Sequence, residues 1–448
     1  MATVGDILSV EQARDGVLAA IETTVEVEVI ATADGLGRVL AGPVRAQTAL
    51  PPWDNSAMDG YAIRSEDVTA ATEDDPVRLE IAGEARAGSQ PDAPVSPGRA
   101  VRIATGAPVP WGADAVAPVE LTTPLGPDDQ PSGPRGQDAT GPVPTACLIH
   151  QAVPAGGSIR RAGSDLAADT VVLEGGTVLT AAGIALAAGA GVARVAVHRR
   201  VRVAVLATGD ELRGPGEPLG PAGIPDANGP GLRALVNASG ADAIDLGIAG
   251  DTLDDVSRRL TAGLEAGADV IIVSGGVSVG PYDVVKTAFD GLGRIDLWRV
   301  AVQPGKPFTF GTAPRPGGGG SPVLLFGLPG NPVSSFVTFE LFVRPALRRL
   351  AGRRDLLRPV DRGVLREPVT KGAGRRAFIR VVAERDPAGA PVRDARGRVR
   401  VHLAGGQAGQ GSHVLSALAV ADALAVVPET SDSLRAGATV ELWWLDRD

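Results

Sequence analysis

The chain has 448 residues, 44% of them hydrophobic but only 3% aromatic, and its formal net charge is −9 at pH 7. This length suits roughly two to four domains with mostly aliphatic cores, and the acidic balance argues against a nucleic-acid-binding protein. The single cysteine, Cys147, cannot form an internal disulfide, which favours a reducing compartment. The chain begins without the basic and apolar segments of a signal peptide, and no apolar run is long enough for membrane insertion. We therefore expect a cytoplasmic protein.

The first 198 residues form an N-terminal region, and the pattern of the chain changes after them, from residue 199. Residues 9–21 combine capping-box spacing with an apolar stripe, which predicts a helix that is a candidate to pack on the following α/β domain. Residues 122–144 are rich in Pro, Gly, Asp and Thr and poor in large apolar residues. That composition predicts a disordered surface insertion without a function.

Polar loops in this region are denser in functional groups than ordinary turns. Residues 51–64 hold two carboxylates, an amide and a hydroxyl, and a later predicted strand ends in a turn at Thr105. Loops carry function more often than cores do, although an Asx-rich turn that satisfies its own backbone has the same composition. The basic pair at 160–161 lies close to Asp165 and fits either a solvated edge or an anion pocket.

Residues 199–350 alternate strands with helices, which predicts a doubly wound, parallel α/β domain. Three predicted strands end in polar glycine turns, at 208–211, 274–276 and 328–331. Ligands bind at the carboxyl edge of such sheets, where glycine turns and helix N-termini present amides to phosphate. One such turn could be a tight connection without a ligand, but three together predict a ligand site.

The residue types near these turns limit the chemistry. The carboxylates in or beside glycine turns are Asp59, Asp165, Asp210, Glu211, Asp226 and Asp283. Hard oxygen ligands of this kind suit Mg²⁺, which proteins usually hold with one or two carboxylates plus substrate phosphates. Four scattered histidines and one cysteine argue against a zinc site. Lys306 is followed by Pro307 where a Walker A loop needs Ser or Thr, which argues against a P-loop NTPase.

The last segment, 351–448, consists of short alternating apolar runs between turns, which predicts a small β-barrel or sandwich. Its first half is rich in Lys and Arg relative to Asp and Glu. We expect most of these cations on a solvated face, although a local positive excess in an acidic protein can also attract an anion.

Six motifs together closely resemble the MoeA/gephyrin family of molybdopterin molybdenumtransferases: PPWDNSAMDGYAIR, RIATGAPVP, TGDEL, SGGVSVGPYDVVK, QPGKP and GLPGNPVSSFVTF. They follow the family's order over nearly the whole chain outside 122–144. The resemblance implies a molybdopterin-binding α/β domain at 199–350 and a C-terminal β-barrel at 351–448. It implies that residues 1–198 form an elongated β-rich region with an inserted second domain at about 46–145. It also implies a homodimer with its site between subunits, and the molybdopterin adenylyltransferase as a further partner. The implied reaction inserts molybdate into adenylylated molybdopterin, with Mg²⁺-dependent release of AMP.

The resemblance also implies roles for the residues that match the family's motifs. Asp226 and Asp283 resemble the carboxylates beside the metal and the nucleotide. The family's site also includes loop residues that come from the other domains, and the residues that resemble these are Asp59, Thr105 and Asp165. The implied catalytic set is Asp59, Asp165, Glu211, Asp226, Asp283 and Lys286. The implied substrate-binding set is Thr105, Thr208, Gly209, Gly275, Gly276, Ser278, Pro329, Asn331 and, for the molybdate oxyanion, Gln303, Lys306, Arg375 and Ser412.

Two positions depart from the family's pattern. Gln303 stands where the family often has a lysine, which leaves the implied molybdate pocket one charge short, and Ser164 stands where it often has a glutamate. A second class of function stays open at this point, a gephyrin-like scaffold that anchors a membrane or cytoskeletal partner. The intact acidic and glycine turns favour the enzyme, because an inactive scaffold would not need Asp226, Asp283 and Lys306 together.

Overall fold

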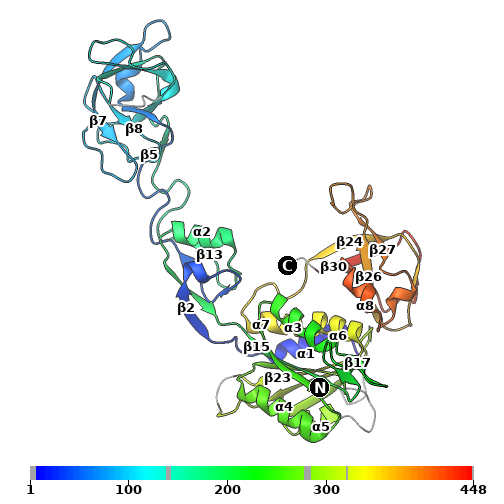
Figure 1. Ribbon diagram of the computed structural model, residues 1–448. Helices are drawn as coiled ribbons and strands as arrows, with labels where there is room; N and C mark the ends of the chain where they lie inside the picture. The colour runs from blue at the N-terminus through cyan, green and yellow to red at the C-terminus, as the bar shows by residue number, and fades with distance from the viewer. Residues whose placement is uncertain (1–6, 138–142, 277–283, 319–320, 446–448) are drawn as a thin grey trace.

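The computed structural model describes residues 7–137, 143–276, 284–318 and 321–445. An α/β domain lies at one end of an elongated arm, the inserted domain lies at the arm's far end, and a C-terminal barrel lies on the other side of the α/β domain (Figure 1). The predicted multidomain α/β fold is therefore confirmed. Every helix in the described part of the chain is too short or too polar to cross a bilayer.

The central sheet of the α/β domain has seven strands in the order β1-β20-β22-β23-β19-β15-β18. In chain order these are β1 (Ile7–Leu8), β15 (Arg202–Thr208), β18 (Asp242–Ala249), β19 (Val270–Ser274), β20 (Arg294–Val300), β22 (Pro307–Ala313) and β23 (Val323–Leu328). β18, β15, β19 and β23 are parallel, but β22 runs antiparallel to both its neighbours. The predicted doubly wound sheet is confirmed, and β22 is the strand that departs from its parallel arrangement. The short hairpin from β22 to β23 can join only antiparallel strands.

Helices cover both faces of this sheet. They are α1 (Val10–Ala19), α3 (Asn228–Ala238), α4 (Leu253–Glu265), α5 (Val284–Asp290), α6 (Pro332–Thr338), a π turn (Phe339–Val343) and α7 (Arg344–Leu350). Along β15, Val203 and Val205 pack with α1, α3, α6 and α7, whereas Ala204 and Leu206 pack with α4 and α5. Successive strand residues point to opposite faces, so a strand buried on both faces is an uninterrupted apolar run.

The N-terminal segment belongs to this domain. Ser9 caps α1 in a reciprocal capping box with Gln12, and Val10, Ala13 and Val17 are buried in the same core as the sheet. β1 also joins the sheet through parallel pairing with β20. The predicted helix therefore packs on the α/β domain instead of the elongated region that follows it in the chain.

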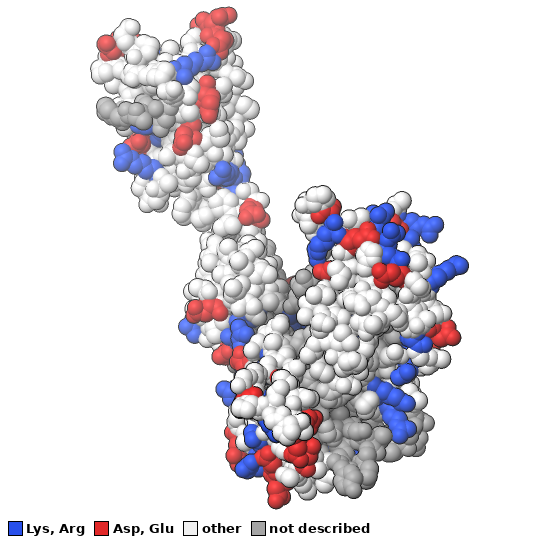
Figure 2. All heavy atoms as spheres, turned by 45° about the vertical axis from the view of Figure 1, so that its right-hand side comes forward, with Lys and Arg blue, Asp and Glu red and all other residues white. Residues whose placement is uncertain are grey.

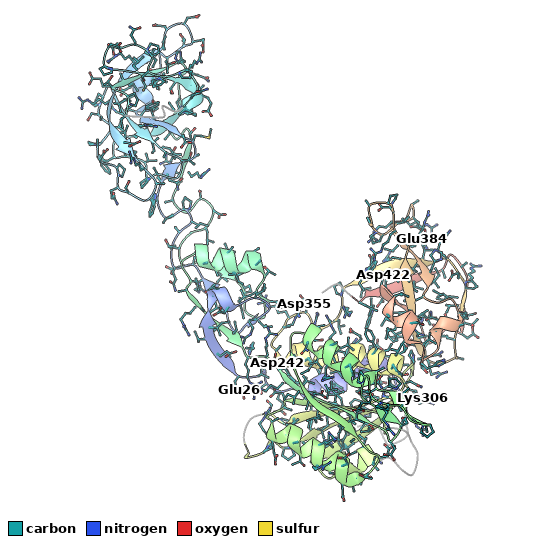
Figure 3. All side chains as sticks on the ribbon, in the orientation of Figure 1. Glu26, Asp242, Lys306, Asp355, Glu384 and Asp422 are labelled. Carbon is teal, nitrogen blue, oxygen red and sulfur yellow. The ribbon has the colours of Figure 1, made fainter. Side chains whose placement is uncertain are left out.

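The elongated domain forms the arm. Its elements are β2 (Val27–Ala31), a 3₁₀ turn (Thr32–Asp34), β3 (Val39–Leu40), β4 (Val44–Arg45), β13 (Val171–Leu173), α2 (Ala181–Gly189) and β14 (Arg194–His198). A salt-bridge network fastens its base to the α/β domain. Asp269 accepts two hydrogen bonds from Arg199, at 2.7 and 2.8 Å, and one from Arg315 at 2.8 Å. Arg199 also pairs with Glu26, which lies at this junction (Figure 3).

The inserted domain is built on a six-stranded sheet in the order β10-β11-β7-β8-β6-β9. Its elements are β5 (Asn55–Ser56), β6 (Gly60–Ile63), a 3₁₀ turn (Ser65–Val68), β7 (Val77–Ala85), β8 (Arg99–Ile103), β9 (Ala115–Pro118), a 3₁₀ turn (Val119–Leu121), β10 (Thr122–Leu125), β11 (Ala146–Ile149) and β12 (Ile159–Arg160).

Two sequence predictions change in this domain. β11 and β12 pair with β7 and β5, so the domain extends beyond the predicted end at residue 145. The start of the predicted disordered insertion is the strand β10, whose residues are buried. β10 is the edge strand of its sheet, and an edge strand accommodates proline because a missing N–H on its outer side costs no ladder hydrogen bond. Residues 138–142 of the insertion lie outside the described residues.

The C-terminal domain is a closed barrel, as predicted. Its five strands are β24 (Val360–Leu365), β26 (Arg376–Ala383), β27 (Val399–Leu403), β28 (Ala423–Val427) and β30 (Thr439–Trp444), and pairing between β26 and β28 closes the ring. β21 (Val302–Gln303) comes from the α/β domain and pairs with β26. Smaller elements are β25 (Val369–Thr370), β29 (Ser433–Leu434), a 3₁₀ turn (Ala408–Gln410) and α8 (Leu415–Ala419).

Candidate active site

A cavity of about 970 Å³ in the α/β domain lies at the carboxyl ends of β15, β19 and β23. The turns after these strands form its floor, and the loop from β17 (Ile224–Pro225) to α3 forms one wall. β17 pairs with the short strand β16 (Leu212–Arg213). His413 and Leu415 of the C-terminal domain complete the lining. The cavity is therefore where α/β sheets bind ligands, and it is shared between two domains.

Most of the predicted site residues of the α/β domain line this one cavity. They are Thr208, Gly209, Glu211, Asp226, Gly275, Gly276, Pro329 and Asn331. Lys286 is exposed on α5 and does not line the cavity, although Val284 of the same helix does. Asp283 and Ser278 lie outside the described residues.

Glycine is required on the cavity floor. Gly275 and Gly276 have φ angles of +96° and +62°, a region that side chains disfavour. A Cβ on Gly275 would lie 2.5 Å from the carbonyl oxygen of Thr208, and one on Gly276 would lie 2.6 Å from a methyl group of Val285. The turns after β15 and β19 thus touch through backbone, and the floor stays open to a ligand.

Asn228 ties the separate turns into one structure. Its Nδ2 donates to Oγ of Ser274 at 2.7 Å and to the carbonyl oxygen of Gly330 at 2.6 Å. These bonds join the start of α3 to the turns after β19 and β23. Asn228 is not among the site residues predicted from the sequence.

Asp226 is the buried carboxylate of the cavity, with 8% of its surface exposed. Its Oδ1 accepts the N–H of Gly229 at 3.0 Å, in the first turn of α3. The other oxygen, Oδ2, lies so close to Gly229 that a Cβ there would clash with it. Glu211 lines the same cavity from the turn after β15.

Hard carboxylate oxygens beside a glycine floor are a donor set that fits Mg²⁺ with a phosphate ligand. Within the described ranges, no group of three or more His, Cys, Asp and Glu residues is arranged to hold a metal. A site with one or two carboxylates, completed by substrate oxygens, is the type that this arrangement suits.

Asp251 lines the cavity as well and was not predicted. The backbone N–H of Asp251 donates to Oδ1 of Asp210 at 3.0 Å, so the turns after β15 and β18 are hydrogen-bonded to each other. The signal was present in the sequence, because a strand followed by Gly250-Asp251 repeats the pattern of Gly209-Asp210.

The residues predicted to bind an oxyanion lie between the α/β domain and the barrel. Oε1 of Gln303 accepts the N–H of Gly372 at 3.1 Å, and the Arg375 guanidinium lies against the same glycine. Gln303 therefore fastens a barrel loop with its side-chain oxygen. Lys306 is exposed on the side of the α/β domain near the barrel (Figure 3). The carbonyl oxygen of Ser412 accepts the N–H of Val333 at 3.1 Å.

These oxyanion residues lie beside the main cavity without lining it themselves. Pro307, next to Lys306, and His413, next to Ser412, do line it. Close by, Nζ of Lys371 donates to the carbonyl oxygen of Arg375 at 2.6 Å, and burial lowers the pKa of the Lys371 ammonium group. The structure thus brings Gln303 and Arg375 together at one loop.

The remaining cations of the C-terminal domain are mostly neutralised at its surface. Figure 2 shows Lys and Arg gathered over this domain together with Asp and Glu. Three of these pairs are Arg385 with Asp422, Arg393 with Asp361, and Arg398 with Asp394. Arg385 and Arg393 are exposed, in agreement with the solvated face that composition predicted, whereas Arg398 is partly buried.

The predicted loop residues of the inserted domain form a second group. Oδ1 of Asp59 accepts the backbone N–H of Thr105 at 2.7 Å, and the backbone N–H of Asp165 donates to the carbonyl oxygen of Leu50 at 3.0 Å. None of the three residues lines the main cavity. The inserted domain, to which Asp59 and Thr105 belong, lies at the far end of the arm from the α/β domain (Figure 1).

The basic pair at 160–161 does not face Asp165. Arg161 pairs with Asp54 at 2.6 Å, and the N–H of Ala162 also donates to Asp54 at 2.7 Å. These two bonds, the backbone one foremost, lower the pKa of the Asp54 carboxyl. Asp54 and Arg161 border a cavity of about 760 Å³ in the inserted domain, and none of the predicted catalytic or substrate-binding residues lines it.

Comparisons with known families cover the three regions in order. Residues 8–191 match the MoeA N-terminal region (domain I and II), residues 204–349 a probable molybdopterin binding domain, and residues 362–445 the MoeA C-terminal region (domain IV). A molybdopterin molybdenumtransferase 2 of Mycobacterium tuberculosis is 39% identical over 416 residues, 91% of this chain and 92% of the relative. The chain belongs to the MoeA family.

Further relatives agree with this MoeA assignment. The molybdopterin molybdenumtransferase of Haemophilus influenzae is 32% identical over 437 residues, 97% of this chain and 98% of that protein. The crystal structure of a molybdopterin biosynthesis MoeA protein from Pyrococcus horikoshii matches with a TM-score of 0.76 at 29% identity, covering 98% of this chain and 99% of the other. The MoeA fold is therefore preserved along nearly the whole length.

Proposed function

We propose that this MoeA-family chain inserts molybdate into adenylylated molybdopterin and releases AMP in a Mg²⁺-dependent step. The chain is a transferase of molybdenum cofactor biosynthesis, in keeping with relatives named molybdopterin molybdenumtransferase. The single observation that supports the reaction best is the cavity at the carboxyl edge of the sheet, where a glycine floor meets the carboxylates of Asp226 and Glu211. The gephyrin-like scaffold is not favoured.

The residues of this cavity suit the proposed substrate. The glycine floor would hold the pterin and its phosphates close to backbone groups. Asp226, with Asp283 by resemblance, would hold Mg²⁺, which when bound neutralises charge on the pyrophosphate oxygens. Lys306 and Arg375 would attract the molybdate dianion, and Ser412 would donate a hydrogen bond to it.

The deciding experiment is cofactor synthesis in vitro. Purified protein is supplied with adenylylated molybdopterin, molybdate and Mg²⁺, and AMP and the molybdenum-loaded cofactor are measured. We expect both products together, and neither without the protein. AMP release without molybdenum insertion would instead indicate a hydrolase and contradict the proposed transferase.

We also propose a homodimer in which Asp59, Thr105 and Asp165 of one subunit complete the cavity of the other. The support is that none of the three residues lines the cavity of the α/β domain, and that the inserted domain lies at the far end of the arm from that cavity (Figure 1). Association with the molybdopterin adenylyltransferase and a cytoplasmic location stay predictions.

Mixing an Asp59→Asn chain with an Asp226→Asn chain is expected to restore part of the activity that each variant lacks alone. A mixed dimer would contain one site with both changes and one site with neither, because the two positions would come from different subunits. The measurement is AMP release after subunit exchange, with mixed dimers quantified by mass spectrometry. Confirmed mixed dimers without activity would mean that both residues serve a site within one chain.

Gln303→Lys is expected to lower the molybdate concentration for half-maximal rate severalfold, and Lys306→Ala to raise it by more. A lysine adds a charged donor for the dianion, and charge-assisted hydrogen bonds are roughly twice as strong as neutral ones. The substitution also removes the acceptor for the Gly372 N–H, so we expect a stability loss of about 1 kcal/mol.

Gln303→Met is the matched control, because it loses the same acceptor without adding charge. The rate is titrated against molybdate at two salt concentrations, and the gain from Gln303→Lys is expected to shrink as salt rises. Equal molybdate dependence in the lysine and methionine variants would assign Gln303 a purely structural role.

A further inference from the structure

Arg380 is a buried cation that the proposed chemistry does not use. It lies on β26, where Ala377, Ile379, Val381 and Ala383 point into the barrel core. Because strand residues alternate between faces, Arg380 points to the outer side of the barrel. Its side chain is nevertheless fully buried, at 0% exposure. The loop that covers it runs from Gly405 to Ser412.

The surroundings of Arg380 hold no countercharge among the described residues. Its Nη2 donates to the carbonyl oxygens of Gly409 at 2.7 Å and Gly411 at 2.9 Å, and its Nε meets no acceptor in the described part of the chain. Burial alone lowers the pKa of its guanidinium to about 10. A buried charge without a charged partner lowers the stability of the folded protein. Residues that destabilise the fold in this way are typically found where function requires them.

The covering loop is fastened to Arg380 twice. Besides the two bonds from the guanidinium, the Gln410 side chain accepts the backbone N–H of Arg380 at 2.9 Å and donates to its carbonyl oxygen at 3.1 Å. At the loop's end, the carbonyl oxygen of Ser412 is held by the N–H of Val333, and His413 lines the main cavity. Arg380 thus lies beneath a wall of the candidate site.

Capture of the Gly411 carbonyl has a geometric consequence for Ser412. The C=O and N–H of a trans peptide point in opposite directions, so the N–H of Ser412 points away from the guanidinium. Within the described ranges, neither this N–H nor the Ser412 hydroxyl makes a hydrogen bond with the protein. Two free donors on one residue suit an oxyanion.

We propose that Arg380 is a positioning residue that orients the Gly411–Ser412 peptide, so that the amide and hydroxyl of Ser412 are presented together to the oxyanion substrate. The inference rests on the proposed function, because it takes molybdate as that oxyanion. Arg380 acts through Ser412 and does not itself touch the ligand.

The test compares Arg380→Met, Arg380→Lys, Ser412→Ala and the double variant Arg380→Met/Ser412→Ala. Molybdate binding is measured by isothermal titration calorimetry on the full chain, and the molybdate dependence of AMP release is measured in parallel. We expect Arg380→Met to weaken molybdate binding about tenfold, as the loss of one well-oriented hydrogen bond to a charged ligand would. Arg380→Lys keeps the charge but loses the planar guanidinium with its fixed N–H donors. This variant is expected to weaken molybdate binding less than Arg380→Met does.

The coupling between Arg380 and Ser412 in the double variant distinguishes a positioning role of Arg380 from a general effect on the stability of the domain. If Arg380 acts through Ser412, the loss of molybdate binding in the double variant is smaller than the sum of the two single losses. Arg396→Met, which removes an exposed arginine of the same domain, is the charge control and is expected to leave binding unchanged. If Arg380→Met does not fold, the same comparison is made with Arg380→Lys, Ser412→Ala and the double variant Arg380→Lys/Ser412→Ala.

Two results would overturn the inference. One is unchanged molybdate binding in both Arg380 variants, and the other is fully additive losses in the double variant. Failure of the wild-type protein itself to bind molybdate or release AMP would contradict the proposed function instead, so the two failures are distinguishable.

Discussion

Asp226→Asn is expected to reduce AMP release at least about tenfold, equivalent to a loss of roughly 1.4 kcal/mol or more in transition-state stabilisation. The amide oxygen of asparagine can still accept the N–H of Gly229, which Oδ1 accepts at 3.0 Å in the wild type. The substitution therefore keeps the first turn of α3 and removes only the charge that would hold Mg²⁺. The loss should be largest when Mg²⁺ is limiting.

The measurement is the rate of AMP release against Mg²⁺ concentration, with thermal unfolding recorded for each protein. Asp242→Asn is a suitable control, because Asp242 is an exposed carboxylate at the start of β18, the opposite end of that strand from the cavity. Wild-type turnover by Asp226→Asn at limiting Mg²⁺ would remove Asp226 from the proposed metal site.

Asp269→Asn is expected to destabilise the α/β domain by about 3 kcal/mol. The side chain of Asp269 is 2% exposed and pairs with Arg199 and Arg315. Removing one partner of a buried pair leaves uncompensated charge, which typically costs about 3–5 kcal/mol. Urea unfolding measures the change, and hydrogen exchange of the β15 and β19 amides isolates this domain from the others.

Glu26→Gln is the matched control for Asp269→Asn. Glu26 pairs with the same Arg199, but its side chain is 71% exposed, and exposed pairs contribute about 0–1 kcal/mol. A loss for Asp269→Asn as small as that for Glu26→Gln would show that the junction between the arm and the α/β domain does not depend on Asp269.

The contribution of Asp269 also depends on pH. Burial by itself raises the pKa of its carboxyl, but hydrogen bonds from Arg199, from the Arg202 N–H and from Arg315 outweigh burial and hold the pKa below its ordinary value. A carboxyl with a depressed folded-state pKa contributes stability that is fully present above its unfolded value, about 3.9. This contribution is lost as pH falls through the folded-state pKa. The difference between wild type and Asp269→Asn should therefore be constant near neutral pH and shrink below about pH 4.

Local turn chemistry explains why so much of the candidate site could be read from the sequence. An apolar run followed by glycine and a polar residue predicts a strand and a ligand-facing turn wherever it occurs. Thr208, Gly275 and Asn331 were found in this way, and all three line one cavity. Asp251 follows the same rule at the turn after β18, although it was not among the predicted site residues.

The direction of β22 and the formation of β10 as a strand both depend on pairing with other segments of the chain. The hairpin after β22 makes that strand antiparallel, although its apolar residues are equally suited to a parallel strand. β10 has a turn-like composition, yet pairing with β11 along one edge of the sheet makes it a strand. Propensity is a weak guide in both cases, because cross-strand contacts contribute more than the intrinsic preference of each residue.

The sequence by itself determined the order of the domains, the glycine turns and the carboxylates of the candidate site, because each depends on residues adjacent in the chain. Only the tertiary structure decided which groups meet across domains. It paired Arg161 with Asp54 instead of Asp165, joined Gln303 to Gly372, and buried Arg380 beneath the loop that ends at Ser412. These contacts join residues far apart in sequence, and burial, which sets the cost of each charge and hydrogen bond, arises only when the chain is packed.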